Sequence, residues 1–418
     1  WGWGLNVDGQ LGDNTIVFDI NTPIQIGTAT NWQLVSAGLN YTVAIKTDGT
    51  LWAWGYNNYG ELGDGTIISK NTPTQIGIAT NWKTVEAGDR FTVAIKTNGT
   101  LWAWGWNGTG GLGDGTLISK TTPTQIGVAT NWRSIATGNY FTAAINTNGT
   151  LWTWGYNANG QLGDGTIINK STPTQIGIAT NWKSIDAGQR HVVAVKTDGT
   201  LWTWGFNGEG QLGDGTAIEK HSPIKIGTAT NWQSVSAGHL HTVAIKTDGV
   251  LWAWGSNAYG QIGQDLSFSY KYYPDIVVNS GNNNQFITSG AYHNGIVKSD
   301  GTLFTWGYNI NGQLGDGTTT NSIVSPTKIS CAALAIEKIL LNNNSFSIYP
   351  NPVKDILYIQ NTNNQNIDKI VITDLTGKNV LEQKGNNKQM NIQQLQQGMY
   401  LLKVFSGGKS SQSKFMKQ

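Results

Sequence analysis

Residues 87–116 read AGDRFTVAIKTNGTLWAWGWNGTGGLGDGT, and this segment carries the clearest local signals of secondary structure in the chain. Two short apolar runs, Thr92–Lys96 and Leu101–Trp104, flank the dipeptide Asn98-Gly99. Asn-Gly between apolar runs is a strong hairpin signal, because both turn positions accept positive φ. The stretch therefore predicts an antiparallel hairpin that is followed by a glycine-rich loop.

The stretch is one copy of a repeat of about 50 residues. Trp-x-Trp-Gly begins at Trp1, Trp52, Trp102, Trp152, Trp202 and Trp252, and a variant begins at Phe304. Ala-Gly-x-x-aromatic-Thr begins at Ala37, Ala87, Ala187 and Ala237, with Thr137 and Ser289 in place of Ala in two further copies. The chain thus holds six full units and the second half of another.

Each unit is expected to form four short strands, which in one copy are Thr74–Ile76, Trp82–Ala87, Thr92–Lys96 and Leu101–Trp104. A single four-stranded sheet buries its faces poorly, so consecutive sheets must stack on one another. About seven such units in a row predict an all-β fold, a β-propeller of about seven blades over residues 1–329.

The two patterns together, Ala-Gly-x-x-aromatic-Thr-x-Ala-Ile and Leu-Trp-x-Trp-Gly-x-Asn-x-x-Gly-Gln-Leu-Gly-Asp-Gly-Thr, resemble the regulator of chromosome condensation repeat. The resemblance covers residues 1–329. It implies a seven-bladed propeller whose ring is closed by strands from both ends of the chain. The missing half unit is then expected upstream of Trp1, so that the propeller in this sequence is truncated at its N-terminal side.

The repeat stops after Ile329, and residues 330–344 form an Ala- and Asn-rich linker. Residues 345–418 contain short apolar runs and a basic end, which predict a small immunoglobulin-like β-sandwich. This segment resembles the C-terminal sorting domain of the type IX secretion system of Bacteroidota. The residues that carry the resemblance are Tyr349, Pro350, Asn351, Pro352, Gly377, Lys378, Gly398, Tyr400, Lys414 and Lys417. The resemblance implies contact with the secretion machinery and a secreted or surface-attached product; the alternative is a structural sandwich of another purpose.

Charge and composition exclude several classes of function. Residues 1–341 carry 18 Lys and Arg against 21 Asp and Glu, so a nucleic-acid partner is not expected. No apolar run reaches the roughly 18–20 residues of a membrane span. Cys331 is the one cysteine of the sequence, which excludes an intrachain disulfide. No cofactor is expected.

Two loops of each unit differ between the copies, and antiparallel pairing places both on one face of the propeller. They are the residues after Ala-Gly and the residue after Trp-Gly. We expect this aromatic-rich face to bind the ligand, since aromatic side chains dominate protein interfaces and sugar stacking. The candidate binding residues are Tyr56, Arg90, Trp106, Tyr140, Tyr156, Arg190, Phe206, Tyr292 and Tyr308. The alternative is that these aromatic residues pack on their own loops and vary neutrally.

Other repeated polar residues have structural explanations. His191, His241 and His293 share a position that holds Tyr41 or Phe91 in other units, so packing is favoured over metal binding. The Gly-Asp-Gly-Thr aspartates lack the spacing of a calcium loop and fit Asx turns instead. Lys70 and its equivalents form either a basic arc or, more simply, a solvated rim. In the irregular sixth unit Gln264 replaces the usual Asp, and its Tyr-rich loop is either a contact site or a local repair.

Three classes of function remain. The favoured one is a secreted or surface-displayed, non-catalytic module that binds an extracellular protein or glycan. The alternatives are a secreted hydrolase or lyase, or an enzyme inhibitor, since the family that the chain resembles includes a secreted β-lactamase inhibitor. Near-perfect repetition offers no unique catalytic constellation, and no catalytic residue is assigned. Nucleotide exchange on a small GTPase is disfavoured, because the 50-residue spacing leaves no room for an inserted wedge.

Overall fold

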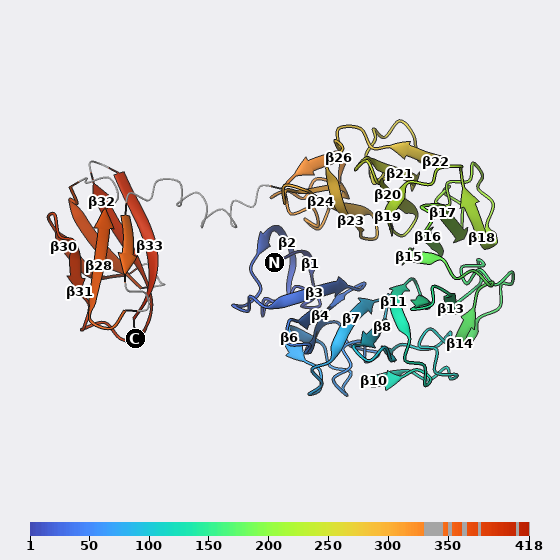
Figure 1. Cartoon of the computed structure of the whole chain (residues 1–418), viewed down its shortest axis with the longest axis horizontal. Coiled ribbons are helices and arrows are strands. Elements are labelled where there is room, and N and C mark those ends of the chain that lie inside the picture. The colour runs from blue at the N-terminus through green and yellow to red at the C-terminus, as the bar shows by residue number, and fades with distance from the viewer. Residues whose placement is uncertain (330–345, 350–352, 362–365, 375–377, 407–408, 418) are drawn as a thin grey trace. The chain divides into compact units, whose positions relative to one another are not determined.

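The computed structural model describes residues 1–329, 346–349, 353–361, 366–374, 378–406 and 409–417. The chain divides into two compact units, Trp1–Ser330 and Cys331–Gln418. The first is a ring of antiparallel sheets and the second a two-layered sandwich (Figure 1). The fold class predicted from the sequence is confirmed. No helix among the described residues is long and apolar enough to cross a membrane.

The ring holds one two-stranded sheet and six four-stranded sheets among the described residues, which we number as blades 1 to 7. Blade 1 consists of β1 (Gly2–Asn6) and β2 (Val17–Ile24). In blades 2 to 7 the first strands are β3 (Trp32–Ala37), β7 (Trp82–Ala87), β11 (Trp132–Thr137), β15 (Trp182–Ala187), β19 (Trp232–Ala237) and β23 (Asn284–Ser289). The second strands are β4 (Tyr41–Lys46), β8 (Phe91–Lys96), β12 (Phe141–Asn146), β16 (His191–Lys196), β20 (His241–Lys246) and β24 (His293–Lys298).

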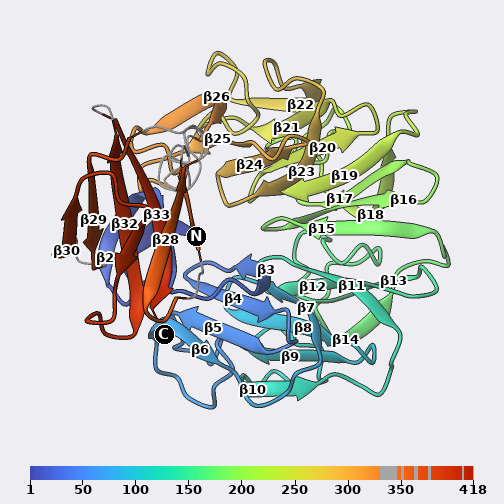
Figure 2. The same ribbon diagram turned by 60° about the vertical axis from the view of Figure 1, so that its left-hand side comes forward.

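The third strands contain the Trp-x-Trp-Gly motif or its variant. They are β5 (Leu51–Gly55), β9 (Leu101–Gly105), β13 (Leu151–Gly155), β17 (Leu201–Gly205), β21 (Leu251–Ser256) and β25 (Leu303–Tyr308). The fourth strands are β6 (Lys70–Gln75), β10 (Lys120–Gln125), β14 (Lys170–Gln175), β18 (Lys220–Ile226), β22 (Tyr270–Ile276) and β26 (Ser322–Lys328). First strands lie nearest the centre of the ring and fourth strands at its outside (Figures 1 and 2).

The phase of the predicted unit was wrong by one strand. The segment around Thr74 was assigned to the same sheet as Trp82, but Thr74 pairs with Ala53 and Gln75 with Trp52 of the preceding motif. The physical reason is the long loop after Trp-Gly, which turns the chain back along the strand that it has just left. Pro73 fits this outer position, because proline cannot donate a ladder hydrogen bond and is tolerated on edge strands.

The core of the ring lies between neighbouring blades. One cluster joins Val43 and Leu51 of blade 2 to Trp82 and Trp104 of blade 3, and similar clusters follow around the ring. The second Trp of the motif is completely or almost completely buried wherever it occurs between Trp54 and Trp306. Each blade therefore depends on its neighbours for burial of its apolar side chains, as expected of stacked repeats.

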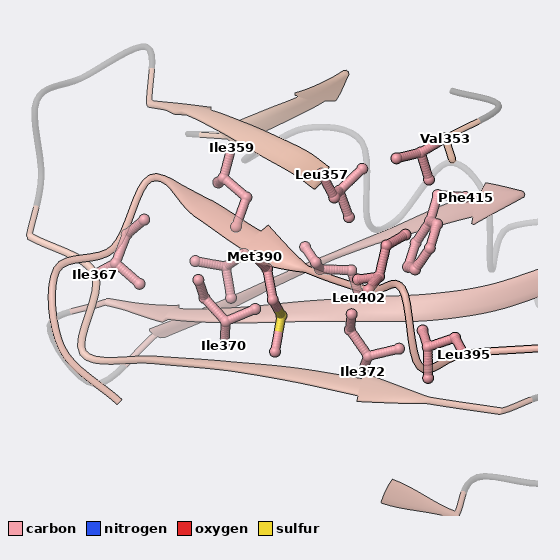
Figure 3. Packing of buried hydrophobic residues seen from close by; sticks show 12 residues of the cluster. Val353, Leu357, Ile359, Ile367, Ile370, Ile372, Met390, Leu395, Leu402 and Phe415 are labelled. Carbon is pink, nitrogen blue, oxygen red and sulfur yellow. The ribbon is translucent and has the colours of Figure 1, made fainter. Parts of the chain in front are cut away.

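The C-terminal unit packs a three-stranded sheet against a four-stranded sheet. The first contains β27 (Phe346–Tyr349), β28 (Ile356–Asn361) and β31 (Gln389–Asn391). The second contains β29 (Lys369–Thr373), β30 (Asn379–Lys384), β32 (Gly398–Ser406) and β33 (Lys409–Lys417). Aliphatic side chains such as Leu357, Ile370 and Leu402 point toward one another and form its core (Figure 3).

Candidate functional site

Two connections of each four-stranded blade lie on one face of the ring, which we call the first face. One joins the first strand to the second and contains Ala-Gly-x-x; the other joins the third strand to the fourth and follows Trp-Gly. The opposite, second face carries the Asp-Gly or Asn-Gly turns and the segments between blades. All nine candidate binding residues lie in or beside the first-face connections, and all nine side chains are half-buried.

Backbone hydrogen bonds join the two first-face connections within each blade. Trp106 N donates to the Arg90 carbonyl oxygen at 2.8 Å, and Tyr156 N donates to that of Tyr140 at 2.9 Å. The same bond links Tyr56 to Asn40, Phe206 to Arg190, and Tyr308 to Tyr292. Eight of the nine candidate residues are thus joined in pairs by backbone hydrogen bonds, and Tyr56 is joined to Asn40.

A buried asparagine anchors each longer connection from within. Asn57 Oδ1 accepts the backbone N–H of Leu62 at 2.9 Å, and Asn57 Nδ2 donates to the Asp64 carboxylate and to the carbonyl oxygen of Ile68, both at 3.2 Å. The same carboxylate accepts hydrogen bonds from Thr66 and forms a 3.0 Å ion pair with Lys70. Equivalent ion pairs join Lys120 to Asp114, Lys170 to Asp164, and Lys220 to Asp214. These lysines and aspartates therefore neutralise one another within their own loops.

Side chains from three consecutive blades meet in what we call the Arg90 cluster: Tyr59, Asp89, Arg90, Trp106 and Tyr140. The Arg90 guanidinium donates to the Tyr59 hydroxyl at 3.0 Å and lies 5.1 Å from the centre of that ring. The rings of Trp106 and Tyr140 are 4.3 Å apart at their centres and tilted by 50°. The cluster combines aromatic surface, a cation and a carboxylate within one small area of the first face.

The backbone and electrostatics of Tyr140 are both unusual. Its φ of 66° lies in the left-handed region, which is uncommon for a residue other than glycine. Burial, the hydrogen bond to the Asp89 side chain and the charge of Asp89 raise the pKa of Tyr140 to about 12. The hydroxyl therefore stays protonated at physiological pH and donates to the Asp89 carboxylate.

Four aromatic side chains form a second group on blades 6 and 7, which we call the Tyr259 cluster: His239, Tyr259, Tyr292 and Tyr308. The ring centres of Tyr259 and Tyr308 are 4.6 Å apart, and those of Tyr259 and Tyr292 are 5.4 Å apart. His239 meets Tyr292 edge to face at 5.2 Å. Burial lowers the pKa of His239, so its ring is neutral at physiological pH.

The other four candidates lie on the same face, and within the described part of the chain they make no ring contact with either cluster: Tyr56, Tyr156, Arg190 and Phe206. Tyr56 accepts a hydrogen bond from Asn58 at 2.9 Å. Arg190 Nε is buried and has no hydrogen-bond partner among the described residues. The same is true of Asn139 Oδ1 and His239 Nδ1, which lie between the first and second strands of the two neighbouring blades. Unsatisfied buried polar atoms are rare in proteins, and three of them occur here in adjacent blades.

Four members of the two clusters were not among the candidate residues predicted from the sequence: Tyr59, Asp89, His239 and Tyr259. A signal was present, because the position of Tyr59 and Tyr259 is Thr109 in blade 3 and Glu209 in blade 5. Such variation within an otherwise uniform loop indicates that the fold does not require a particular residue at this position.

The repeated histidines are part of the packing between blades. His191 and His241 are fully buried, and their Nε2 atoms contact Thr242 Oγ1 at 3.0 Å and Asn294 Oδ1 at 2.9 Å in the next blade. Burial, together with nearby histidines, lowers the pKa of His191 to about 3. Within the described residues, no group of three or more His, Cys, Asp or Glu side chains is arranged to hold a metal ion.

The irregular loop of blade 6 is exposed. Phe268 of this loop exposes 54% of its surface and Tyr273 65%, but Tyr273, like Tyr270 and Tyr272, lies in β22 and not in the loop as predicted. Lys271 Nζ lies 4.4 Å from the centre of the Phe268 ring. Gln264 donates to Asp275, which also pairs with Lys271. The ion pair of the regular blades is thus replaced by one within the fourth strand.

Six of the ten sequence-predicted sorting residues can be placed. Tyr349 ends β27, and Lys414 and Lys417 lie in β33. Gly398 begins β32, Tyr400 stacks on Phe415 at 5.8 Å, and the exposed Lys378 follows β29. Pro350, Asn351, Pro352 and Gly377 lie outside the described residues, as does the linker 330–344.

A ring of antiparallel blades followed by a small β-sandwich defines the class: a repeat propeller with an appended C-terminal domain. The chain belongs to the family of RCC1-like domains, whose model matches residues 120–343. Regulator of chromosome condensation (RCC1) repeats match residues 1–45 and 48–95, and a secretion system C-terminal sorting domain matches residues 347–418. The resemblances inferred from the sequence are confirmed, and the sorting domain directs the propeller to the cell surface or the exterior by type IX secretion.

Individual relatives support the fold more than any activity. The ultraviolet-B receptor UVR8 of Arabidopsis thaliana is 39% identical over 64 residues, which cover 15% of this chain and only 14% of that receptor. Prp20p of Saccharomyces cerevisiae is 20% identical, with a TM-score of 0.71 over 83% of this chain and 87% of that one. Human WBSCR16 is 19% identical, with a TM-score of 0.70 over 78% of this chain and 92% of that one. At these identities the two structures show a shared fold.

Proposed function

We propose that this secreted propeller is a non-catalytic binding protein, and that its first face recognises an extracellular protein or glycan. The Arg90 cluster is the observation that carries the proposal. It offers ring faces for sugar or side-chain stacking, guanidinium donors and a carboxylate acceptor within a small area. Tyr, Trp and Arg are the residues most enriched among those that dominate binding energy at interfaces.

The rigidity of the first face supports the same proposal. Backbone hydrogen bonds join the two connections of each blade, and Asn57-type anchors hold the longer ones. Half-burial already limits the freedom of the aromatic side chains before any ligand arrives. Binding then orders few groups, which reduces the entropic cost of association.

The repeat supplies matched variants for a test. Blade 6 has Ser256 where blade 3 has Trp106, and Leu240 where it has Arg90. Trp106→Ser and Arg90→Leu therefore install residues that the fold accepts at the same position elsewhere. Lys83→Gln is the control, since Lys83 is exposed at the start of a first strand on the second-face side and Gln233 is its equivalent.

The full chain and the three variants would be screened on arrays of glycans and bacterial surface proteins. We expect one ligand class whose binding falls at least tenfold in Trp106→Ser and Arg90→Leu and is unchanged in Lys83→Gln. A ligand that binds all four proteins equally would overturn the assignment to the Arg90 cluster. Chemical conversion of a bound ligand would overturn the non-catalytic part of the proposal.

A further inference from the structure

A pair of tryptophans with a lysine lying over it recurs on the second face. In blade 3, Trp82 and Trp102 meet edge to face with ring centres 5.9 Å apart, and Lys96 Nζ lies 3.9 Å from the Trp102 centre and 4.6 Å from the Trp82 centre. Blades 2, 5 and 6 repeat the arrangement. There the Nζ atoms of Lys46, Lys196 and Lys246 lie 3.7 to 3.9 Å from the ring centre of the tryptophan on the third strand. The two rings thus form a cradle for an ammonium group, held by cation–π attraction.

Blade 4 has the same tryptophans but not the lysine. Trp132 and Trp152 meet at 5.9 Å and 78°, which is almost the geometry of blade 3. Asn146 stands in place of the lysine, and its Oδ1 is held by the N–H and hydroxyl of Thr150. Among the described residues no cation lies over either ring. The cradle is therefore complete in blade 4, while its ammonium group is missing.

An almost fully exposed aliphatic side chain stands in each of the two segments that flank blade 4. Val128, in the segment that enters blade 4, is 92% exposed, and Ile178, in the segment that leaves it, is 94% exposed. Ile78, one blade earlier, is also 94% exposed, whereas Thr28 and Thr228 occupy the same position elsewhere in the ring. These aliphatic side chains stand singly, one in each segment between blades, and each offers an apolar contact to a bound segment.

We propose that the second face over blade 4 docks a protein segment that places the ammonium group of a lysine over the Trp132 and Trp152 rings. The chemistry is that of the other blades, where a lysine of the chain itself occupies the cradle. The flanking Val128 and Ile178 would contact apolar residues beside that lysine. This site lies on the opposite face from the Arg90 cluster and does not depend on the function proposed for it.

The test uses the full chain labelled with 5-fluorotryptophan, with the resonance of Trp152 assigned through Trp152→Phe. The probe is Nα-acetyl-lysine methylamide, and its neutral counterpart Nα-acetyl-norleucine methylamide serves as the control ligand. A single ammonium on an aromatic pair binds weakly, so we expect the Trp152 resonance to shift with a dissociation constant on the order of tens of millimolar. The norleucine control should leave it in place.

Two variants built from the repeat itself make the outcome decisive. Asn146→Lys supplies the lysine of blades 2, 3, 5 and 6, so it should fold normally and abolish the shift. Lys96→Asn empties the cradle of blade 3 and should make the Trp102 resonance respond to the probe. Absence of a shift in the parent chain, or an equal shift in Asn146→Lys, would overturn the proposal. Tighter binding of tetramethylammonium than of the lysine probe would redirect the site from a protein lysine to a quaternary ammonium ligand.

Discussion

The indole N–H of Trp3 donates a 3.0 Å hydrogen bond to the carbonyl oxygen of Gln313, which lies 310 residues further along the chain. The same bond joins consecutive blades elsewhere: Trp104 to Glu61, Trp154 to Gly111, Trp204 to Gln161, Trp254 to Gln211 and Trp306 to Gln261. At the same junction Gly317 N donates to the Asn21 carbonyl oxygen at 2.9 Å. The first and last blades are therefore joined by the contacts that join most other neighbouring pairs.

Replacing Trp204 with phenylalanine should destabilise the propeller more than the same change at Trp54. In most blades a threonine also donates to the accepting carbonyl, but Val192 stands at that position in blade 5, so Gln161 O has Trp204 as its one side-chain donor among the described residues. A buried acceptor left without a donor costs about 1–3 kcal/mol. Trp54 Nε1 has no partner among those residues, so Trp54→Phe loses packing alone. Equal urea midpoints, followed by far-UV circular dichroism, would contradict a role for the indole bond.

Two glycines with similar backbone angles should tolerate alanine very differently. Gly127 has a φ of 62° with no atom within 4 Å of an added Cβ, whereas at Gly99, with a φ of 77°, that Cβ would lie 2.0 Å from the Thr130 carbonyl oxygen. Gly127→Ala should cost about 1–2 kcal/mol, the strain of a left-handed alanine. Gly99→Ala must also move the segment that enters the next blade, and should lower the unfolding midpoint much further. Similar unfolding midpoints for the two variants would show that the segment around Thr130 can move at little cost in free energy.

The fold could be predicted from the sequence because each blade repeats the same local signals. The strand phase could not be read from periodicity alone, since a repeat of 50 residues looks the same wherever its boundary is drawn. Pro73 and its equivalents held the missing information, because a proline in every copy of one strand marks it as the outer edge. Hairpin signals are local in sequence, while the identity of an edge strand depends on the whole sheet.

The sequence predicted which face of the propeller carries the candidate site, but not which side chains on that face lie together. Arg90 meets Tyr59, and Thr92 meets Glu61, so residues 31 positions apart touch across a blade boundary. This spacing follows from the stacking of blades and has no counterpart in the sequence pattern. Sequence reasoning therefore identified Arg90 and Tyr140 individually but did not connect them to Tyr59 and Asp89.

Glu61 should make the stability of the propeller depend on pH. Its side chain is fully buried, one carboxylate oxygen accepts the Tyr59 N–H, and the other has no partner among the described residues. Burial raises its pKa from 4.5 to about 7. The folded state thus binds the proton more tightly than the unfolded chain. The contribution of Glu61 to the free energy of unfolding should be fully present below pH 4.5 and should fall as the pH rises toward 7. Above pH 7 the loss should be on the order of 3 kcal/mol.

Glu61→Gln should remove most of that loss. Gln161, Gln211, Gln261 and Gln313 occupy the same position and accept the same backbone N–H, so the fold already accommodates the amide. Urea midpoints measured between pH 4.5 and 8.5 would show a flatter profile for the variant. An unchanged profile would mean that the Glu61 carboxylate is solvated in the folded protein.

Glu86 and Asp186 should add a second pH dependence from the innermost strands of blades 3 and 5. Ser36 donates to Glu86 at 3.1 Å, while Asp186 accepts the backbone N–H groups of Ala187 and Ala237, both at 2.9 Å. Burial and the charge of Asp186 raise the pKa of Glu86 to about 8, and burial also raises the pKa of Asp186. Ionising Glu86 is therefore unfavourable in the folded ring, so stability should keep falling from pH 7 to beyond pH 8.

Glu86→Ser tests this directly, because Ser36 and Ser236 stand at the same position in blades 2 and 6. The variant removes the titrating carboxylate and should raise the unfolding midpoint at pH 9 relative to the parent chain, with a smaller change at pH 5. Combined with Glu61→Gln it should leave a flatter profile between pH 6 and 9, in which the buried Asp186 carboxylate still contributes. If Glu86→Ser lowered the midpoint equally at both pH values, the Ser36 hydrogen bond would outweigh the charge, and the carboxylate would act as a structural link between blades 2 and 3.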